Sequence, residues 1–250
     1  MSEFSLCVLG CGDAFCSGGR AQTCFHVKTK QQSLLLDCGA TTLLAMRQQQ
    51  VDPNIIDRIL ISHLHGDHFG GVPFFLLHAH FELRRTKRLS ILGPKGTRNR
   101  IKAAIDVLFP DVGDVAWHFP LEVIELEAGD EATIADIQLT SHLVDHPSGA
   151  PALAFRLASG GKVVAFSGDT RWTGTLIEIA DGADLLITEC HSYKPNGVPH
   201  LDWETLSARK NQLRAQRILL THMSNSMLTE LPRLEPSDFE FAEDGLMTHI

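Results

Sequence analysis

The chain has 250 residues, of which 44% are hydrophobic, and a formal net charge of −8, so it can bury a sizeable core. The acidic balance argues against a nucleic-acid binder, because such proteins carry a basic stripe that neutralises phosphates. No apolar run approaches the ~20 residues of a membrane helix and no secretory leader is visible, so we expect a soluble, cytoplasmic protein.

The first half of the chain alternates between strand and helix patterns. In chain order we predict strands at 4–10, 24–28 and 33–37, a helix at 41–50 and a strand at 58–62. A helix at 67–83, a strand at 89–92 and a helix over the apolar stripe 101–109 follow. The basic run at 84–88 is interpreted as a solvated helix face, with a substrate or partner patch as the alternative.

The second half begins with frequent turns between residues 115 and 157, which predict antiparallel strands. A strand–helix rhythm follows, with strands at 162–167, 184–188 and 217–221, helices at 173–180 and 203–213, and a last edge strand at 246–250. Two successive sets of strands and helices favour two packed sheets covered by helices, in one domain spanning residues 1–250. Periodicity alone leaves a doubly wound sheet open.

The strongest chemical signal is the segment ISHLHGDHFGG at 61–71, directly after an apolar strand. It holds His63, His65, Asp67 and His68 within six residues, and imidazole nitrogens and carboxylate oxygens suit zinc-like divalent ions. A single helix or strand face cannot present all four side chains. A glycine-rich loop that turns into a helix can direct them toward two adjacent ions. The segment therefore predicts a metal site.

The motif H-L-H-G-D-H at 63–68 resembles the signature of the metallo-β-lactamase superfamily. The resemblance implies an α/β fold, the αββα sandwich in which two β-sheets pack face to face with helices outside. It also implies a binuclear site for two divalent metal ions, with zinc expected first and manganese as the alternative. His63 and His65 would bind one ion, and Asp67 and His68 the other.

Later motifs resemble the remaining ligands of that superfamily. Asp169, in SGDT at 167–170, follows an apolar strand and resembles the bridging carboxylate. His222, in ILLTHMS at 218–224, is similar to the last histidine. His146 precedes an apolar strand as the third histidine of the family does, and His142 remains the alternative. The resemblance thus implies two ligand sets: His63, His65 and His146, and Asp67, His68 and His222. Five further histidines are expected to be ordinary core or surface residues: His26, His78, His80, His118 and His249.

Within the superfamily, the closest resemblance is to ribonuclease Z and the smaller phosphodiesterases related to it. LLLDCGA at 34–40 resembles their strand and DCG turn, with Asp37 as a structural carboxylate. ILGPKGT at 91–97 resembles their Gly-Pro turn. LLITECH at 185–191 resembles the strand that carries their catalytic glutamate, here Glu189. His200 stands where that branch places a histidine paired with the glutamate.

Two departures from ribonuclease Z bear on the substrate. Only 22 residues lie between His146 and Asp169, too few for the long Gly/Pro-rich arm of that enzyme. The residues after His200 are also larger and less hydroxylated than in its motif. We therefore predict a small phosphodiester substrate, such as a cyclic nucleotide-like or phosphoribosyl compound, and no nucleic-acid or membrane partner. A lactone, thioester or sulfate ester hydrolase, a tRNA 3′-processing endonuclease and an inactive metal-binding scaffold are the alternatives.

The resemblance also implies a mechanism. Two adjacent ions lower the pKa of a bound water, and the resulting hydroxide attacks the substrate. The predicted catalytic residues are Asp67, His200 and Glu189, with His200 oriented by Glu189 to protonate the leaving group. A purely structural hydrogen bond is the alternative for that pair, and His191 is a weaker substitute donor. We also expect a homodimer, formed through the apolar helix that carries Phe74, Phe75, Leu76, Leu77 and Phe81.

Overall fold

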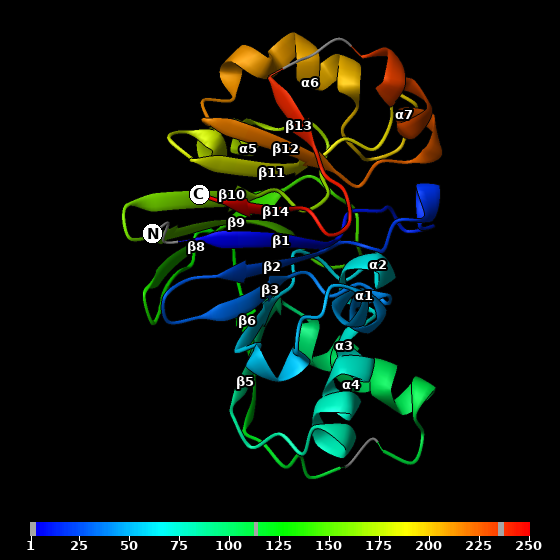
Figure 1. Ribbon diagram of the computed structural model, residues 1–250, viewed down its shortest axis with the longest axis vertical. Coiled ribbons are helices and arrows are strands. Elements are labelled where there is room, and N and C mark those ends of the chain that lie inside the picture. The colour runs from blue at the N-terminus through cyan, green and yellow to red at the C-terminus, as the bar shows by residue number, and fades with distance from the viewer. Residues whose placement is uncertain (1–3, 113–114, 235–237) are drawn as a thin grey trace.

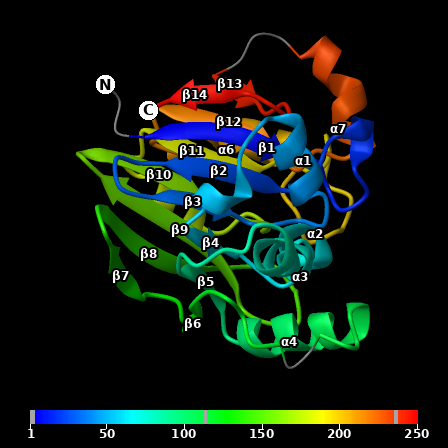
Figure 2. The same ribbon diagram turned by 60° about the horizontal axis from the view of Figure 1, so that its bottom comes forward.

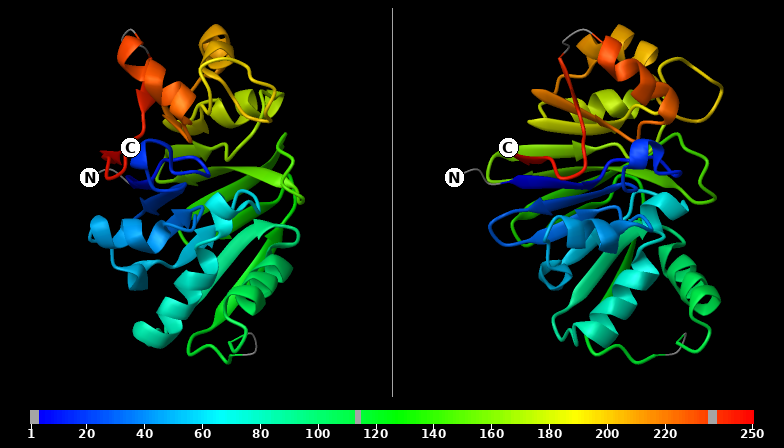
Figure 3. Two further views of the ribbon diagram at one scale, coloured as in Figure 1. Left: turned by 90° about the vertical axis from the view of Figure 1, so that its right-hand side faces the viewer. Right: turned by 45° about the vertical axis from the view of Figure 1, so that its right-hand side comes forward.

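The computed structural model describes residues 4–112, 115–234 and 238–250, and it is built on two seven-stranded sheets (Figure 1). The two sheets pack face to face and helices cover the outer face of each, so the predicted αββα sandwich is confirmed and the doubly wound alternative is excluded. Figure 3 shows α3 and α4 at one end of the molecule and α6 and α7 at the other, with the strands between them.

The first sheet has the strand order β14-β1-β2-β3-β4-β5-β6. Its strands are β1 (Ser5–Gly10), β2 (Cys24–Lys28), β3 (Ser33–Leu36), β4 (Arg58–Leu60), β5 (Leu89–Pro94), β6 (Leu121–Leu126) and the edge strand β14 (Met247–His249). Pairing is antiparallel from β14 to β3 and parallel from β3 to β6.

The second sheet repeats this plan, with the strand order β13-β12-β11-β10-β9-β8-β7. Its strands are β7 (Glu131–Ile134), β8 (Ile137–Val144), β9 (Ala152–Ser159), β10 (Lys162–Phe166), β11 (Leu185–Glu189), β12 (Arg217–Thr221) and β13 (Phe239–Phe241). Pairing is antiparallel from β7 to β10 and parallel from β10 to β13.

The helices divide between the two outer faces (Figures 1 and 2). Against the first sheet lie α1 (Thr42–Gln48), α2 (Gly66–Phe69), α3 (Val72–Leu77) and α4 (Thr97–Leu108), and against the second lie α5 (Gly174–Ala180), α6 (Trp203–Arg209) and α7 (Asn225–Glu230). Short turns of other helix types are η1 (Ser17–Gly19), η2 (Pro53–Ile55), η3 (His78–Glu82), η4 (Lys210–Gln212) and η5 (Leu231–Arg233).

Three buried apolar clusters hold these layers together. The central one lies between the sheets, where Phe25 of β2 meets Phe166 of β10 edge to face with ring centroids 5.7 Å apart. The other two lie between each sheet and its helices. Because both faces of each sheet are covered, strands such as β3 and β11 are buried at every position, including the polar residues Ser33, Thr188 and Glu189.

Some predicted elements differ from the observed ones. The single helix expected over residues 67–83 is divided into α2, α3 and η3, because Gly70 and Gly71 separate its first two parts. A Cβ on Gly71 would lie 2.2 Å from the carbonyl oxygen of Gly39, so this close approach requires glycine. The region 115–157 is not wholly antiparallel, since β6 pairs in parallel with β5.

The apolar stripe at 101–109 is also narrower than predicted. Ile101 and Ile105 are buried, but 48% of Leu108 is exposed.

The basic run at 84–88 is not a solvated helix face. It lies between η3 and β5, and Arg85 is only 1% exposed. Its guanidinium group donates hydrogen bonds to four backbone carbonyl oxygens, those of Asn54, Ile56, Lys87 and Arg88. This arginine therefore ties neighbouring loops together.

No helix among the described residues is long and apolar enough to cross a membrane.

Candidate metal centre

The side chains predicted to bind metal gather where strands of both sheets end. His63 follows β4, and Asp67 and His68 lie on α2 directly after it. From the second sheet, His146 follows β8 and Asp169 follows β10. His222 comes directly after β12 on the same sheet. The carboxyl ends of these strands meet at one edge of the sandwich, so residues up to 159 positions apart in the sequence become neighbours.

The first group of ligand-type atoms contains three imidazoles. His63 Nε2 lies 3.2 Å from His65 Nδ1, and His146 Nε2 lies 3.1 Å from that same atom. Ligand atoms at 2.0–2.1 Å from a tetrahedral zinc ion lie ~3.3 Å apart, so this spacing suits a shared ion. The geometry brings together the three residues that the resemblance assigned to one ion.

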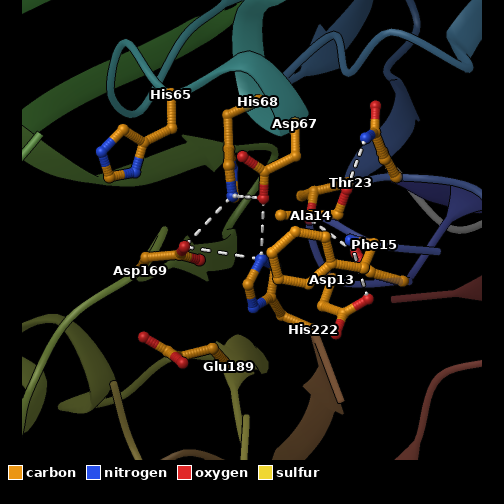
Figure 4. Close-up of polar contacts among 12 residues, drawn as sticks. Asp13, Ala14, Phe15, Thr23, His65, Asp67, His68, Asp169, Glu189 and His222 are labelled. Carbon is orange, nitrogen blue, oxygen red and sulfur yellow. Dashed lines mark hydrogen bonds and ion pairs between the residues drawn. The ribbon is translucent and has the colours of Figure 1, made fainter. Parts of the chain in front are cut away.

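The second group contains Asp67, His68, Asp169 and His222, all buried. Asp67 Oδ2 lies 3.1 Å from His222 Nε2 and 3.3 Å from His68 Nε2. Figure 4 shows the Asp169 carboxylate facing both histidines. Asp169 Oδ2 is 3.2 Å from His68 Nε2 and 3.5 Å from His222 Nε2.

Asp169 also faces the first group. Its Oδ2 atom lies 3.8 Å from His63 Nε2 and 3.9 Å from His146 Nε2. One carboxylate oxygen is thus within reach of both groups, which is the position that a bridging ligand requires. These two groups together are called the histidine–aspartate cluster below.

The hydrogen bonding of the histidine–aspartate cluster fits a pair of divalent ions. His68 Nε2 is buried and lies 3.2 Å from Asp169 and 3.3 Å from Asp67 without forming a well-directed hydrogen bond to either carboxylate, although its other ring nitrogen is satisfied. A metal ion between these atoms would satisfy the nitrogen and both carboxylates. Nitrogen and carboxylate oxygen are also the donor types that zinc prefers.

Asp37 holds His68 in place from behind. Its Oδ2 atom lies 2.6 Å from His68 Nδ1 and accepts a hydrogen bond from the hydroxyl of Ser62, while Oδ1 accepts one from the Ser62 backbone N–H. The carboxylate is fully buried, and its backbone has a φ of 60°, in the left-handed region. A carboxylate behind a metal-facing histidine fixes the tautomer and the ring orientation.

The electrostatic field of the histidine–aspartate cluster favours positive charge. Burial alone would lower the pKa of His222, but Asp169 and Asp67 outweigh burial and raise it to about 9. Burial likewise opposes the charged form of His68, yet Asp169 and Asp37 hold its pKa well above the ordinary value. The buried carboxylates thus require cationic partners, and protonated histidines or bound metal ions can both supply that charge.

Glu189 and His200 meet beside the histidine–aspartate cluster. Glu189 ends β11, is fully buried, and accepts a hydrogen bond of 2.6 Å from the backbone N–H of Thr170. His200 Nδ1 lies 3.0 Å from Glu189 Oε2 and 3.8 Å from Asp169 Oδ2. Burial raises the pKa of Glu189 to about 7. Burial would lower the pKa of His200, but the hydrogen bond to Glu189 outweighs it and raises that pKa.

His191 stacks on His200, with ring centroids 4.6 Å apart. Burial first, and then the neighbouring His200 and His222, lower the pKa of His191 to about 4, which favours its neutral form. Its Nδ1 atom is buried without a hydrogen-bond partner. His191 was named only as a substitute proton donor, and the structure places it in the same cavity as His200.

His142 lies apart from these groups. It is on β8, half-exposed, and its Nε2 atom contacts the hydroxyl of Thr140 at 3.1 Å. Among the described residues it belongs to no group of metal-ligand type, whereas His146 does. The five histidines expected to be ordinary residues, His26, His78, His80, His118 and His249, are likewise outside every such group.

A cavity of about 270 Å³ opens over the histidine–aspartate cluster. Its polar floor includes Asp67, Asp169 and His200, and its walls include Phe15 and Val198. The sequence gives no sign of the position of Phe15, because an apolar residue in a loop carries no pattern that distinguishes a cavity wall from a chance surface position.

Known proteins resemble this chain in sequence and in fold. The chain is 27% identical to ribonuclease Z from Thermoplasma acidophilum, over 97% of this chain and 93% of that protein. A diphosphatase from the PhnP family superposes with a TM-score of 0.80 at 18% identity, covering 99% of this chain and 98% of that one. Zinc-bound PqqB from Methylobacterium extorquens superposes with a TM-score of 0.76 at 16% identity, covering 98% and 100%.

The fold and these relatives identify the chain as a metallo-β-lactamase-fold protein of the ribonuclease Z-like branch. The metallo-β-lactamase superfamily is one of metal-dependent hydrolases. Within it, the family model described as "Anti-Pycsar protein Apyc1" matches residues 4–246, nearly the whole chain. The chain belongs to this family.

Proposed function

We propose that this protein hydrolyses a small phosphodiester with the help of two divalent ions, zinc first and manganese as the alternative. The proposed ligands of one ion are His63, His65 and His146, those of the other are Asp67, His68 and His222, and Asp169 bridges the two. The observation that carries this proposal is the position of Asp169 Oδ2, within 3.9 Å of a histidine nitrogen in each group.

Bound ions would supply a water of lowered pKa and neutralise the charge on a phosphoryl oxygen. The protein's own contribution lies in the groups around them. Asp67 is placed to hold one ion together with His222, whose Nε2 atom lies 3.1 Å from its Oδ2 atom. His200 is placed to give a proton from Nε2 to the departing oxygen, because its Nδ1 atom is engaged by Glu189. Glu189 is itself held by the Thr170 backbone, so the imidazole is oriented before substrate arrives.

The surroundings of the site favour a small substrate. A cavity of about 270 Å³ is below the ~300–1,000 Å³ typical of sites for drug-sized ligands. The chain between His146 and Asp169 forms only β9, a turn and β10, so no arm projects there to hold a folded RNA. We therefore propose a small molecule, such as a cyclic nucleotide-like or phosphoribosyl compound, although curated relatives are named ribonuclease Z.

Metal content and a substrate panel test the proposal together. Purified protein supplemented with zinc or manganese should hold close to two ions per chain by elemental analysis, and a chelator should abolish hydrolysis. A stoichiometry that never exceeds one would contradict the binuclear site.

In the same preparation, a chromogenic phosphodiester should be cleaved in preference to a lactone, a thioester, a sulfate ester and a tRNA precursor. Faster cleavage of the lactone, the thioester or the sulfate ester would replace the phosphodiesterase assignment while leaving the metal site intact. Faster cleavage of the tRNA precursor would keep the phosphodiester bond but replace the small substrate.

A further inference from the structure

Phe15 is the most exposed large apolar side chain among the described residues, at 87% exposure, and it stands at the mouth of the cavity over the histidine–aspartate cluster. Most exposed apolar residues lie scattered over a surface and need no explanation. Phe15 differs because its neighbours in the cavity wall are the proposed metal ligands and the proposed proton donor. In Figure 4 it projects from the Asp13–Ala14 turn toward the side of the cluster that holds Asp67 and His222.

The loop that carries Phe15 is firmly held, so its exposure is not the result of a frayed segment. Asp13 is 2% exposed, and its carboxylate accepts hydrogen bonds from the backbone N–H groups of Phe15 and Ser17 and from the Ser17 hydroxyl, at 3.2, 2.8 and 2.8 Å. The Gln22 side chain donates a hydrogen bond to the carbonyl oxygen of Ala14 at 2.9 Å.

This loop is also joined to the histidine–aspartate cluster. The backbone N–H of His222 donates to the carbonyl oxygen of Cys11 at 2.9 Å, and Gly12 forms a β-bridge with Met223. The position of Phe15 relative to His222 is thus set by backbone hydrogen bonds. A loop whose backbone is preorganised in this way loses little conformational entropy when a ligand packs against the side chain that it carries.

A second apolar wall completes the cavity. Val198, 42% exposed, and Pro199 lie on the loop before His200. The carbonyl oxygen of Pro199 is 3.0 Å from His146 Nδ1, so this wall is also tied to a proposed ligand. The cavity therefore has a polar floor that suits a phosphoryl group and apolar walls on two loops from distant parts of the chain.

We propose that Phe15 is a substrate-binding residue that packs against a planar ring carried by the phosphoester, and that it selects ring-bearing substrates over aliphatic ones. This rests on the proposed function in that the phosphoryl group occupies the polar floor. An aromatic face offers a flat, polarisable surface that stacks on aryl and heteroaryl rings with little regard to their hydrogen-bonding pattern. An aliphatic group of similar length covers less of that face, so removing the Phe15 ring affects ring-bearing ligands most.

The test uses two stable phosphonates with the zinc-loaded protein. Phenylphosphonate and methylphosphonate share the anionic group and differ in the ring. We expect calorimetry to show that the wild type binds phenylphosphonate about ten-fold more tightly, that Phe15→Ala loses most of this ratio, and that Phe15→Tyr keeps it. The binding of methylphosphonate should be nearly unchanged in both variants.

The control variant is Met247→Ala, which removes a 69% exposed apolar side chain on the edge strand β14, outside the cavity lining. It should keep the wild-type ratio. Equal affinities of the wild type for the two phosphonates, no binding of either, or an equal loss for both in Phe15→Ala would each overturn the proposal.

The same variants separate this inference from the proposed function. The kcat/KM on bis(p-nitrophenyl) phosphate, a ring-bearing ester, should fall about ten-fold in Phe15→Ala and stay near the wild-type value in Met247→Ala. If the wild type does not cleave this ester but still binds phenylphosphonate preferentially through Phe15, the phosphodiesterase assignment fails and the ring-binding role stands.

Discussion

Two histidines at this site are each oriented by a buried carboxylate. His68 can present Nε2 to the cluster because Asp37 engages Nδ1, and His200 is oriented in the same way by Glu189. In both pairs the carboxylate is fully buried and is held in turn by backbone N–H groups. Each pair therefore has one geometry, which is what metal binding or proton transfer at a fixed atom requires.

The choice between His146 and His142 can be decided by metal content. His146→Ala should reduce bound zinc from about two ions to about one and remove nearly all activity, since it deletes one of three converging imidazoles. His142→Ala should keep both ions, because that ring contacts Thr140 instead. Elemental analysis after gel filtration measures this, and the opposite pattern would show that the ligand was wrongly assigned.

The role of His200 can be tested by comparing turnover on substrates with poor and good leaving groups. His200→Ala should leave metal content unchanged and cut turnover by roughly 10²–10⁴-fold on an alkyl phosphodiester, the usual range for a general acid. The loss should be much smaller for a nitrophenolate ester, whose leaving group departs without a proton. Glu189→Gln should give a milder form of the same defect. Equal losses on both substrates would make His200 a residue that only positions the substrate.

At the scale of elements, the strands deliver residues to one edge while the loops between them hold the chemistry. Gly71 lets α3 begin against the Cys38–Gly39 backbone, and this packing directs α2 and its two metal-facing residues inward. Strand β2 carries a buried titratable side chain. His26 on this strand is only 8% exposed, and its ring forms a hydrogen bond of 2.7 Å with Ser33 Oγ on β3.

His26 should make the stability of the first sheet depend on pH. Burial, and then the charge of Lys28, lower its pKa from 6.5 to about 4, so the unfolded chain binds the proton more tightly than the folded one. The free energy of unfolding should therefore fall by up to about 3 kcal/mol as the pH drops from 6.5 to 4. His26→Gln should remove this part of the pH dependence.

Urea unfolding of wild type and variant across that range measures the difference. The control Met247→Ala removes an exposed side chain that does not titrate, and its curve should follow the wild type. A His26→Gln protein with the same slope as the wild type would contradict the prediction.

At the scale of the whole molecule, the described residues include a surface that stays apolar after folding. It lies on α3, η3 and α4 and is called the α3–α4 surface, with Phe74, Phe81, Val107 and Leu108 exposed by 41–80%. Phe74 meets Phe109 edge to face at 5.3 Å, so the aromatic rings extend across both helices. Exposed apolar surfaces of this kind often form subunit contacts. Of the apolar residues named for the predicted homodimer, Phe74 and Phe81 are exposed here whereas Phe75 and Leu76 are buried, and the homodimer stays a prediction.

Light scattering at micromolar concentration should give the mass of a dimer. Phe81→Lys combined with Val107→Lys should shift it to a monomer, because two charges would be buried without partners. Met247→Lys changes an exposed apolar residue on β14 and should leave the dimer intact. A monomeric wild type would contradict the dimer prediction.

The organisation of residues 1–250 as one domain also stays a prediction.

The sequence by itself determined the fold class, through the family resemblance of its motifs, and the origin of the site. His63 to His68 lie within six residues after an apolar strand, so local spacing alone indicated metal chemistry. Most strands and helices followed from short-range patterns, as did the edge strand β14. Family resemblance extended the ligand set to later motifs, and the structure brings those residues to the same edge.

Only the tertiary structure decided which distant groups meet. His142 and His146 precede the same strand, and no local pattern tells that one ring points to the cluster and the other to Thr140. The division of the helix at Gly71 depended on the approach of Gly39, which lies 32 residues earlier. Phe15 became a cavity wall only because hydrogen bonds join its loop to the His222 turn. These outcomes depend on long-range packing, and such contacts leave no periodic trace in the sequence.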